Sequence, residues 1–389
     1  MLCIRNGQIH DGIHRDPYVS DILIDNGRIV KIAANISADD CQVVDAAGLR
    51  IYPGFVEAHC HTGLSVYGSA GAGREVNESN DPVTPQLRAI DGIDPADQAL
   101  KEAARAGVTC IATGPGSTNV IGGQFLAMKT WGECVDDMVV RDPVAMKCAF
   151  GENPKSCYGK NRISSRMTIA AILRDTLSKA QRYMQKVDAA QGDPAKLPPY
   201  DQKMEALLPV MRKEIPLKAH AHQRNDIFTA IRIAKEFDLK LTLEHVTEGH
   251  LIVDKLSKVD YPMAVGPSFS DGMKIEYSRR DWSTAGVLAK AGCRVSIVTD
   301  APVIPLWHLP MCAGYAVKAG MDPFAALQAI TINPARQLGI EDRVGSLEVG
   351  KDADLVLMDA PLPLRRRFIG SISMVAAFSR KRRCKIYEK

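Results

Sequence analysis

The chain has 389 residues, 24% charged and 46% hydrophobic, and its 49 basic and 45 acidic side chains leave a formal net charge of +4. This composition excludes a disordered, fibrous or disulfide-framework protein. A charge so close to balance gives no reason to expect a nucleic-acid or membrane partner, and no stretch approaches the roughly 20 apolar residues of a membrane span.

The ten cysteines are scattered along the chain without a Cys-x-x-Cys pair. Several lie in apolar runs, where a thiol behaves as a small hydrophobic group. The first residues also lack the charged-then-apolar layout of a signal peptide. These features predict a protein of the reducing cytoplasm.

Both ends of the chain are predicted to be rich in β-strands. Near the N-terminus, short alternating segments separated by turns cover residues 2–6, 21–25 and 28–32. Near the C-terminus, candidate strands cover residues 354–358, 372–378 and 384–387. We therefore predict a small β-sandwich domain formed by both termini, residues 1–53 together with 346–389.

Between these ends, short apolar runs alternate with helical patterns, which is typical of parallel βα units. Eight runs are candidate strands: 54–61, 108–113, 124–130, 144–151, 216–222, 240–246, 263–267 and 294–300. No clear helical pattern separates the second run from the third. Because eight such strands close a barrel, the predicted fold class is α/β, a (β/α)8 TIM-type barrel over residues 54–345.

Candidate metal ligands lie at the ends of these strands. In His59-Cys60-His61 the two histidines point the same way, because strand side chains alternate between faces. The ends of the fifth, sixth and eighth strands supply His220, His245 and Asp300. In a barrel these ends converge on one face, where neutral imidazoles and a carboxylate are good zinc ligands. The sequence therefore predicts a metal site.

The fourth strand adds Glu152, whose carboxylate is suited to bridge two divalent ions. In this arrangement His59 and His61 would hold one ion, with Asp300 near it, and His220 and His245 would hold the other. The alternative role for Glu152 is a salt bridge to a nearby basic residue.

These segments resemble the amidohydrolase superfamily of metal-dependent hydrolases, in its imidazolonepropionase and dipeptidase-like branch. The matching segments are Pro53-Gly54-Phe55-Val56-Glu57-Ala58-His59-Cys60-His61, Lys218-Ala219-His220, Leu243-Glu244-His245, Thr299-Asp300-Ala301-Pro302 and Gly345-Ser346-Leu347-Glu348-Val349-Gly350-Lys351-Asp352-Ala353-Asp354-Leu355. The resemblance covers nearly the whole chain. It implies a barrel joined to a β-sandwich, one or two divalent ions per chain with zinc preferred, a small-molecule substrate and a homo-oligomer.

The resemblance also bears on the bridging ligand, which in the family is often a carboxylated lysine on the fourth strand. Lys147 is therefore the rival of Glu152. Strand alternation places the two side chains on opposite faces, and only Glu152 lies at the carboxyl end of the predicted strand. We therefore predict Glu152 as the bridge.

The reaction implied is hydrolysis of a C–N bond in an amide, cyclic amide or dipeptide, with Asp300 as general base and then general acid. Nucleobase deaminases of the family typically carry a glutamate three residues after the fifth-strand histidine. Here that position is Gln223, which cannot transfer a proton. The alternative is a mononuclear deaminase or imidazolone-type ring hydrolase. A scaffold role is disfavoured because every predicted ligand is kept.

Four further residues are candidates for substrate binding. His222 lies on the same face as His220, and a role as a metal ligand is its alternative. Arg224 and Tyr158 are suited to a substrate carboxylate. His308 follows Asp300 in the same loop, and its alternative role is loop packing.

Overall fold

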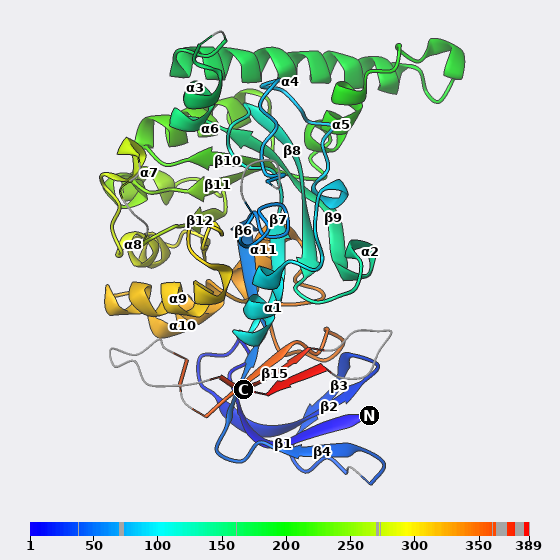
Figure 1. Ribbon diagram of the computed structural model, residues 1–389, viewed down its shortest axis with the longest axis vertical. Helices are drawn as coiled ribbons and strands as arrows, with labels where there is room; N and C mark the ends of the chain where they lie inside the picture. The colour runs from blue at the N-terminus through cyan, green and yellow to red at the C-terminus, as the bar shows by residue number, and fades with distance from the viewer. Residues whose placement is uncertain are drawn as a thin grey trace.

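The computed structural model describes residues 1–359 apart from 38, 70–73, 161, 270, 271 and 273, as well as 361, 362 and the backbone of 372–377 and 385–388. Residues 378 and 384, at the ends of two predicted strands, lie outside the described part. Two sheets dominate the molecule, a central one and a terminal one at the lower end in Figure 1.

The central sheet forms a nearly closed barrel, which confirms the α/β class and the predicted eight strands. Its strands are β6 (Phe55–Cys60), β7 (Val108–Thr113), β8 (Ile121–Lys129), β9 (Val139–Ala149), β10 (Leu217–Ala221), β11 (Leu241–His245), β12 (Met263–Val265) and β13 (Val295–Ile297). They lie side by side in chain order. Burial on both faces explains why they read as continuous apolar runs.

One strand departs from the predicted parallel barrel. β8 pairs antiparallel with both β7 and β9, whereas the other neighbours are parallel. Antiparallel neighbours need no helical crossover, so a short connection suffices between them. This explains the missing helical pattern before the third predicted strand.

The seam of the barrel lies between β13 and β6. Glu57 Oε1 accepts a hydrogen bond from the backbone of His59 at 2.9 Å. Its Oε2 accepts two from Thr299, 2.8 Å from the backbone nitrogen and 2.7 Å from Oγ1. The backbone nitrogen of His61 donates to Ala301 at 2.8 Å. A buried side chain thus joins the first and last strands where the described residues form no ladder.

Helices surround the barrel. The longest, α4 (Arg166–Ala189), is capped by Ser165 and buries Ile169, Leu173 and Leu177 on one stripe. The others are α1 (Gln98–Arg105), α2 (Val135–Met138), α3 (Glu152–Tyr158), α5 (Gln202–Met211), α6 (Arg224–Glu236), α7 (Val253–Leu256), α8 (Thr284–Lys290), α9 (Leu309–Lys318), α10 (Pro323–Gln328) and α11 (Ile332–Leu338). Among the described residues, no helix has both the length and the apolarity to cross a membrane.

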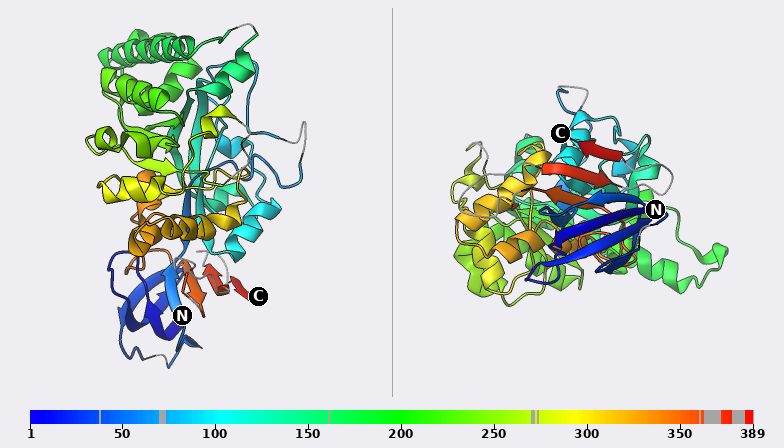
Figure 2. Two further views of the ribbon diagram at one scale, coloured as in Figure 1. Left: turned by 90° about the vertical axis from the view of Figure 1, so that its left-hand side faces the viewer. Right: turned by 90° about the horizontal axis from the view of Figure 1, so that it is seen from below.

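The terminal sheet contains strands from both ends of the chain, which Figure 2 shows side by side. Its members are β1 (Leu2–Ile9), β2 (Tyr18–Asp25), β3 (Arg28–Ala33), β4 (Gln42–Asp45), β5 (Arg50–Pro53), β14 (Leu355–Met358), β15 (Ile372–Ala377) and β16 (Lys385–Glu388). β5 pairs with both β1 and β14, and so joins the two ends. The described strands form one sheet; the sandwich and the domain bounds stay predictions.

Candidate metal centre

The histidines and the aspartate predicted as ligands come together at the carboxyl ends of the barrel strands. Asp300 Oδ1 lies 3.6 Å from His59 Nε2 and 3.4 Å from His61 Nε2, and Asp300 Oδ2 lies 3.9 Å from His245 Nδ1. The rings of His220 and His245 are 4.5 Å apart. All five side chains are buried. Residues separated by up to 241 positions in the sequence thus share one interior site.

Two of these residues have unusual backbone conformations. His245 has a φ of 75° and Asp300 a φ of 54°, in the left-handed region that few residues other than glycine adopt. Such conformations persist where the surrounding structure enforces them, and they cluster at functional sites.

Hydrogen bonds at Nδ1 fix the orientation of three histidine rings. His59 Nδ1 donates to Glu244 at 2.8 Å, His61 Nδ1 to the carbonyl of Gly114 at 2.7 Å, and His245 Nδ1 to the carbonyl of Gly266 at 2.8 Å. These acceptors place the proton on Nδ1 and leave Nε2 as a lone-pair donor. Metal-binding histidines are usually held in this way.

Sequence reasoning assigned no role to Glu244 or to Lys218, which donates to the same Glu244 oxygen at 2.9 Å. Both side chains are almost completely buried. The sequence did contain a sign of this pair, since each charged residue lies inside an apolar strand. Such a residue must find a partner, because an unpaired buried charge is costly.

The electrostatics of the cluster suit a cation. Burial lowers the pKa of four histidines well below the usual value: His59, His220, His222 and His245. They are therefore neutral at pH 7. Burial alone would raise the pKa of Asp300, but the neighbouring His245 and His61 lower it below the usual range of a carboxyl. The site thus offers neutral imidazoles and an ionised carboxylate.

Several buried polar atoms of the cluster lack a partner. Both ring nitrogens of His220 and Nε2 of His245 have no hydrogen bond within the described part of the chain. Buried polar atoms normally find partners, so each of these needs an explanation. Imidazole nitrogens and carboxylate oxygens are zinc ligands, and a divalent ion fits this donor set.

The structure does not bring Glu152 to the histidines as predicted. β9 ends at Ala149, and Gly151, with a φ of 83°, turns the chain so that Glu152 begins α3. The premise that the strand continues to residue 152 was therefore wrong. Lys147 lies at the cluster instead, with Nζ 3.1 Å from His59 Nε2, and burial lowers its pKa to about 8.

The four residues predicted to bind substrate lie in different places. His222 belongs to the cluster, with its ring stacked on His245 at 4.4 Å. Tyr158 instead donates to the backbone carbonyls of Glu78 and Asp81 and so holds the loop before α1.

Arg224 begins α6 and extends toward Glu248, 3.9 Å away, with 52% of its side chain exposed. His308 lies beside the ring of Trp307. The contacts of Arg224 and His308 in the described residues are with these neighbours and not with the histidine cluster.

Two residues of the loop after β12 were missed. Glu276 is buried, with Oε2 3.9 Å from His220 Nε2 and 4.0 Å from His222 Nε2. Lys274 Nζ lies 3.1 Å from the same oxygen. Glu276 lies in the short 3-10 helix Ile275–Tyr277, and Lys274 immediately precedes it. This segment has no sequence periodicity, so no local signal pointed to the two residues.

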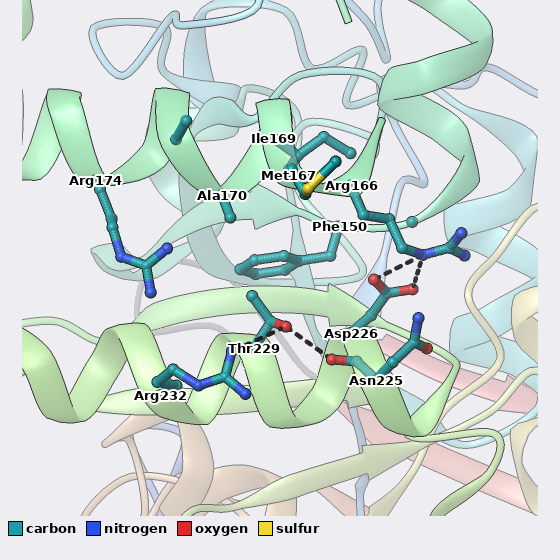
Figure 3. Close-up of a pocket in the computed structure, with 12 residues that line it drawn as sticks. Phe150, Arg166, Met167, Ile169, Ala170, Arg174, Asn225, Asp226, Thr229 and Arg232 are labelled. Atoms are coloured by element: carbon teal, nitrogen blue, oxygen red, sulfur yellow. Dashed lines mark hydrogen bonds and ion pairs between the residues drawn. The ribbon is translucent and has the colours of Figure 1, made fainter. Parts of the chain in front are cut away.

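A separate cavity of about 420 Å³ lies between α4 and α6 (Figure 3). Arg166 crosses its rim and donates from Nε to both carboxylate oxygens of Asp226 at 3.0 Å. None of the predicted metal ligands lines this cavity. It is therefore distinct from the histidine cluster.

Comparison with known proteins agrees with this fold. The chain is similar to the crystal structure of an amidohydrolase from Thermotoga maritima MSB8, with 38% identity and a TM-score of 0.93 over 97% of this chain and 98% of that one. The structure of molinate hydrolase, at 19% identity and a TM-score of 0.57, covers 97% of this chain and 94% of its own, and shows a shared fold alone.

Among curated proteins, amidohydrolase TasK of Hapsidospora irregularis is 29% identical over 373 residues. The match covers 88% of this chain but only 38% of TasK, so the chain spans well under half of that relative's length. A sequence model of the amidohydrolase family matches residues 50–385. The chain therefore belongs to the amidohydrolase family.

Proposed function

We propose that the protein is a metal-dependent hydrolase that cleaves a C–N bond in an amide, cyclic amide or dipeptide. The observation that carries this proposal is the buried cluster of neutral histidines around the ionised Asp300. Membership of the amidohydrolase family supports a hydrolytic reaction. The name of the relative TasK, an amidohydrolase, is consistent with it.

A divalent ion, when bound, would lower the pKa of a coordinated water to near 7 and polarise the scissile carbonyl. His59 and His61, at the end of β6, would hold one such ion, and His220 and His245, on β10 and β11, would hold a second. Asp300 would accept the proton of the attacking water and return it to the leaving nitrogen. Its lowered pKa keeps this carboxylate ionised in the metal-free protein, which is the proton-accepting form, although the same shift makes it a weaker base.

Lys147 is our proposed bridging residue in place of Glu152. Its amine is buried beside His59, and its pKa of about 8 gives a larger neutral fraction at pH 7 than an exposed lysine has. A neutral amine is the form that reacts with carbon dioxide to give the carboxylated lysine common in the family.

Deamination is disfavoured by the environment of Gln223. Arg166 Nη2 donates to Gln223 Oε1 at 2.6 Å, which engages the amide outside the histidine cluster. An amide cannot shuttle a proton to a leaving amine. A ring hydrolase with a single ion remains the alternative reaction.

We further propose zinc as the ion, a small-molecule substrate, a homo-oligomeric assembly and a cytoplasmic location without nucleic-acid or membrane partners. The donor set of imidazoles and a carboxylate supports zinc, because these ligands match its preferences.

The test is a screen of zinc-loaded protein against N-acyl amino acids, dipeptides and cyclic amides. Hydrolysis should disappear after chelation and return with zinc. Asp300→Asn should lower the rate by roughly 10²–10⁴-fold, the usual contribution of a general base. Metal content measured on the same sample separates loss of the base from loss of the ion. Hydrolysis that is indifferent to chelation would refute the proposal.

A further inference from the structure

Three histidines form a group that the predicted pairing of His220 with His245 does not explain. The ligand atoms of His220, His222 and His245 all lie within 4.8 Å of one another. Ring centroids are 4.4–4.7 Å apart in the three pairs. Nitrogens on a tetrahedral zinc lie about 3.4 Å apart, given bonds of about 2.0–2.1 Å. The rings would therefore have to move closer, and the stacked rings of His222 and His245, now 14° from parallel, would have to tilt to direct both lone pairs at one ion.

His222 is oriented like the other predicted ligands. Its Nδ1 lies 2.7 Å from the hydroxyl of Thr247, and its side chain is completely buried. A hydrogen bond at Nδ1 leaves Nε2 on the side of Glu276, whose Oε2 is 4.0 Å away. The residue thus has the outer partner that metal-binding histidines normally have.

Glu276 supplies a carboxylate to the same point. Its Oε1 is fixed by the backbone nitrogen of Glu152 at 2.8 Å, whereas its Oε2 faces His220 and His222 without a hydrogen bond. Gly151 makes this approach possible, because a Cβ there would lie 2.0 Å from Glu276 Oε1. The turn that removes Glu152 from the cluster therefore brings Glu276 to it.

A cation already lies at this point in the form of the Lys274 ammonium. Its Nζ is 3.1 Å from Glu276 Oε2 and 3.3 Å from His222 Nε2. The ammonium balances the buried carboxylate and lies within hydrogen-bond distance of His222, but it leaves both ring nitrogens of His220 and Nε2 of His245 without a hydrogen bond in the described residues. It is on a loop with 18% of its side chain exposed, so it can leave the site.

We propose that His220, His222, His245 and Glu276 form a divalent-metal site of three histidines and one carboxylate, with Lys274 as the cation that the metal displaces. This ligand set suits zinc. This inference rests on the proposed metal-dependent function. It makes His222 a metal ligand instead of a substrate-binding residue. The side chain of Glu152 is not a ligand of this site; only its backbone nitrogen contributes, by holding Glu276.

The experiment measures zinc per chain and zinc affinity by titration of metal-free protein against a chromophoric chelator. Wild type should bind two ions. His222→Gln and Glu276→Gln should each weaken the second ion by more than the roughly 10–100-fold loss typical of a residue that only orients a ligand. His250→Gln, outside the cluster, and Glu152→Gln are the matched controls and should keep both ions.

Lys274→Met tests the displacement in the opposite direction. Removing the competing ammonium should tighten binding of the second ion, and a damaged fold cannot produce such a gain. Circular dichroism of each metal-free variant checks that it folds. X-ray absorption at the zinc edge, which counts imidazole ligands, should show one histidine fewer per two ions in His222→Gln.

The outcomes separate this inference from the proposed function. If wild type binds two ions and His222→Gln or Glu276→Gln keeps both with unchanged affinity, that residue is not a ligand and the inference fails, while metal-dependent hydrolysis stands. A single ion insensitive to both substitutions also overturns it. If wild type binds no ion, the inference and the proposed function fail together.

Discussion

Glu244 Oε2 lies 2.8 Å from His59 Nδ1, and both side chains are fully buried. The same oxygen accepts a hydrogen bond from Lys218 at 2.9 Å, so one carboxylate orients the histidine and balances a buried ammonium. This relationship joins β11 to β6 across the barrel. It explains how His59 presents Nε2 to the candidate metal centre.

Glu244→Gln should therefore weaken metal binding without removing a ligand. The amide can still accept from His59, but it lacks the charge that raises the basicity of the ring. Lys218 also loses this counter-charge and keeps its hydrogen bond to the carbonyl of Ala58. We expect metal affinity to fall about 10–100-fold. Zinc titration against a chelator measures this, with the exposed Glu102→Gln as control. Equal affinity in the two variants would contradict the orienting role.

Thr299→Val should weaken the seam of the barrel. The substitution conserves shape and removes the hydrogen bond from Oγ1 to the buried Glu57. Burial raises the pKa of Glu57 to about 8, so most of this carboxyl is neutral at pH 7. A hydrogen bond between neutral groups contributes about 0.5–1.5 kcal/mol, and we expect a loss of unfolding free energy of that size. Urea denaturation measures it. Thr229→Val on the surface helix α6 is the control, and a similar loss there would argue against a special role for the seam.

Lys129→Met should destabilise the joint between the barrel and the terminal sheet. Lys129 Nζ lies 2.5 Å from Asp354 and 3.0 Å from Asp352, and all three side chains are buried. Removing the cation leaves the buried Asp354 without its cationic partner, whereas Asp352 keeps Arg343 at 2.7 Å. Breaking a buried pair in this way typically costs about 3–5 kcal/mol.

The matched control for this loss is Lys179→Met, which breaks an exposed pair with Asp175 on α4. An exposed pair is worth roughly 0–1 kcal/mol, so this variant should unfold almost like wild type. Denaturant midpoints of the two variants give the comparison. Equal effects would mean that burial of the Lys129 cluster adds nothing.

His10→Gln should reduce the sensitivity of the protein to mild acid. Burial lowers the pKa of His10 to about 4 from 6.5, and its ring stacks on Tyr52 at 4.6 Å. The unfolded chain therefore binds this proton more readily than the folded one. Stability is fully present above pH 6.5 and is lost as the pH falls toward 4. Urea midpoints at pH 7 and pH 5 should differ less in the variant; an unchanged difference would refute this.

The sequence located most of the candidate metal centre for a simple reason. His59, His61, His220, His245 and Asp300 each follow an apolar strand, and the carboxyl ends of barrel strands share one face. Knowledge of the strands was therefore enough to bring these residues together. The same reasoning failed for Glu152, because a single glycine turn at Gly151 ended the alternation of side chains on which it depended.

The direction of each strand also could not be predicted from the sequence. Apolar runs indicate burial but not orientation, so the antiparallel β8 was indistinguishable from its parallel neighbours. A missing helix before β8 was the one local sign of it.

Local periodicity and motif spacing by themselves determined the α/β class, the eight barrel strands and the histidine and aspartate cluster, because each depends on neighbours in the chain. Tertiary structure alone decided that Glu244 orients His59 from 185 positions away and that Glu276 and Lys274 reach His222 from a loop. A buried charge needs a partner, because an unpaired one is costly. Only the folded barrel determines which charged side chains lie close enough to pair.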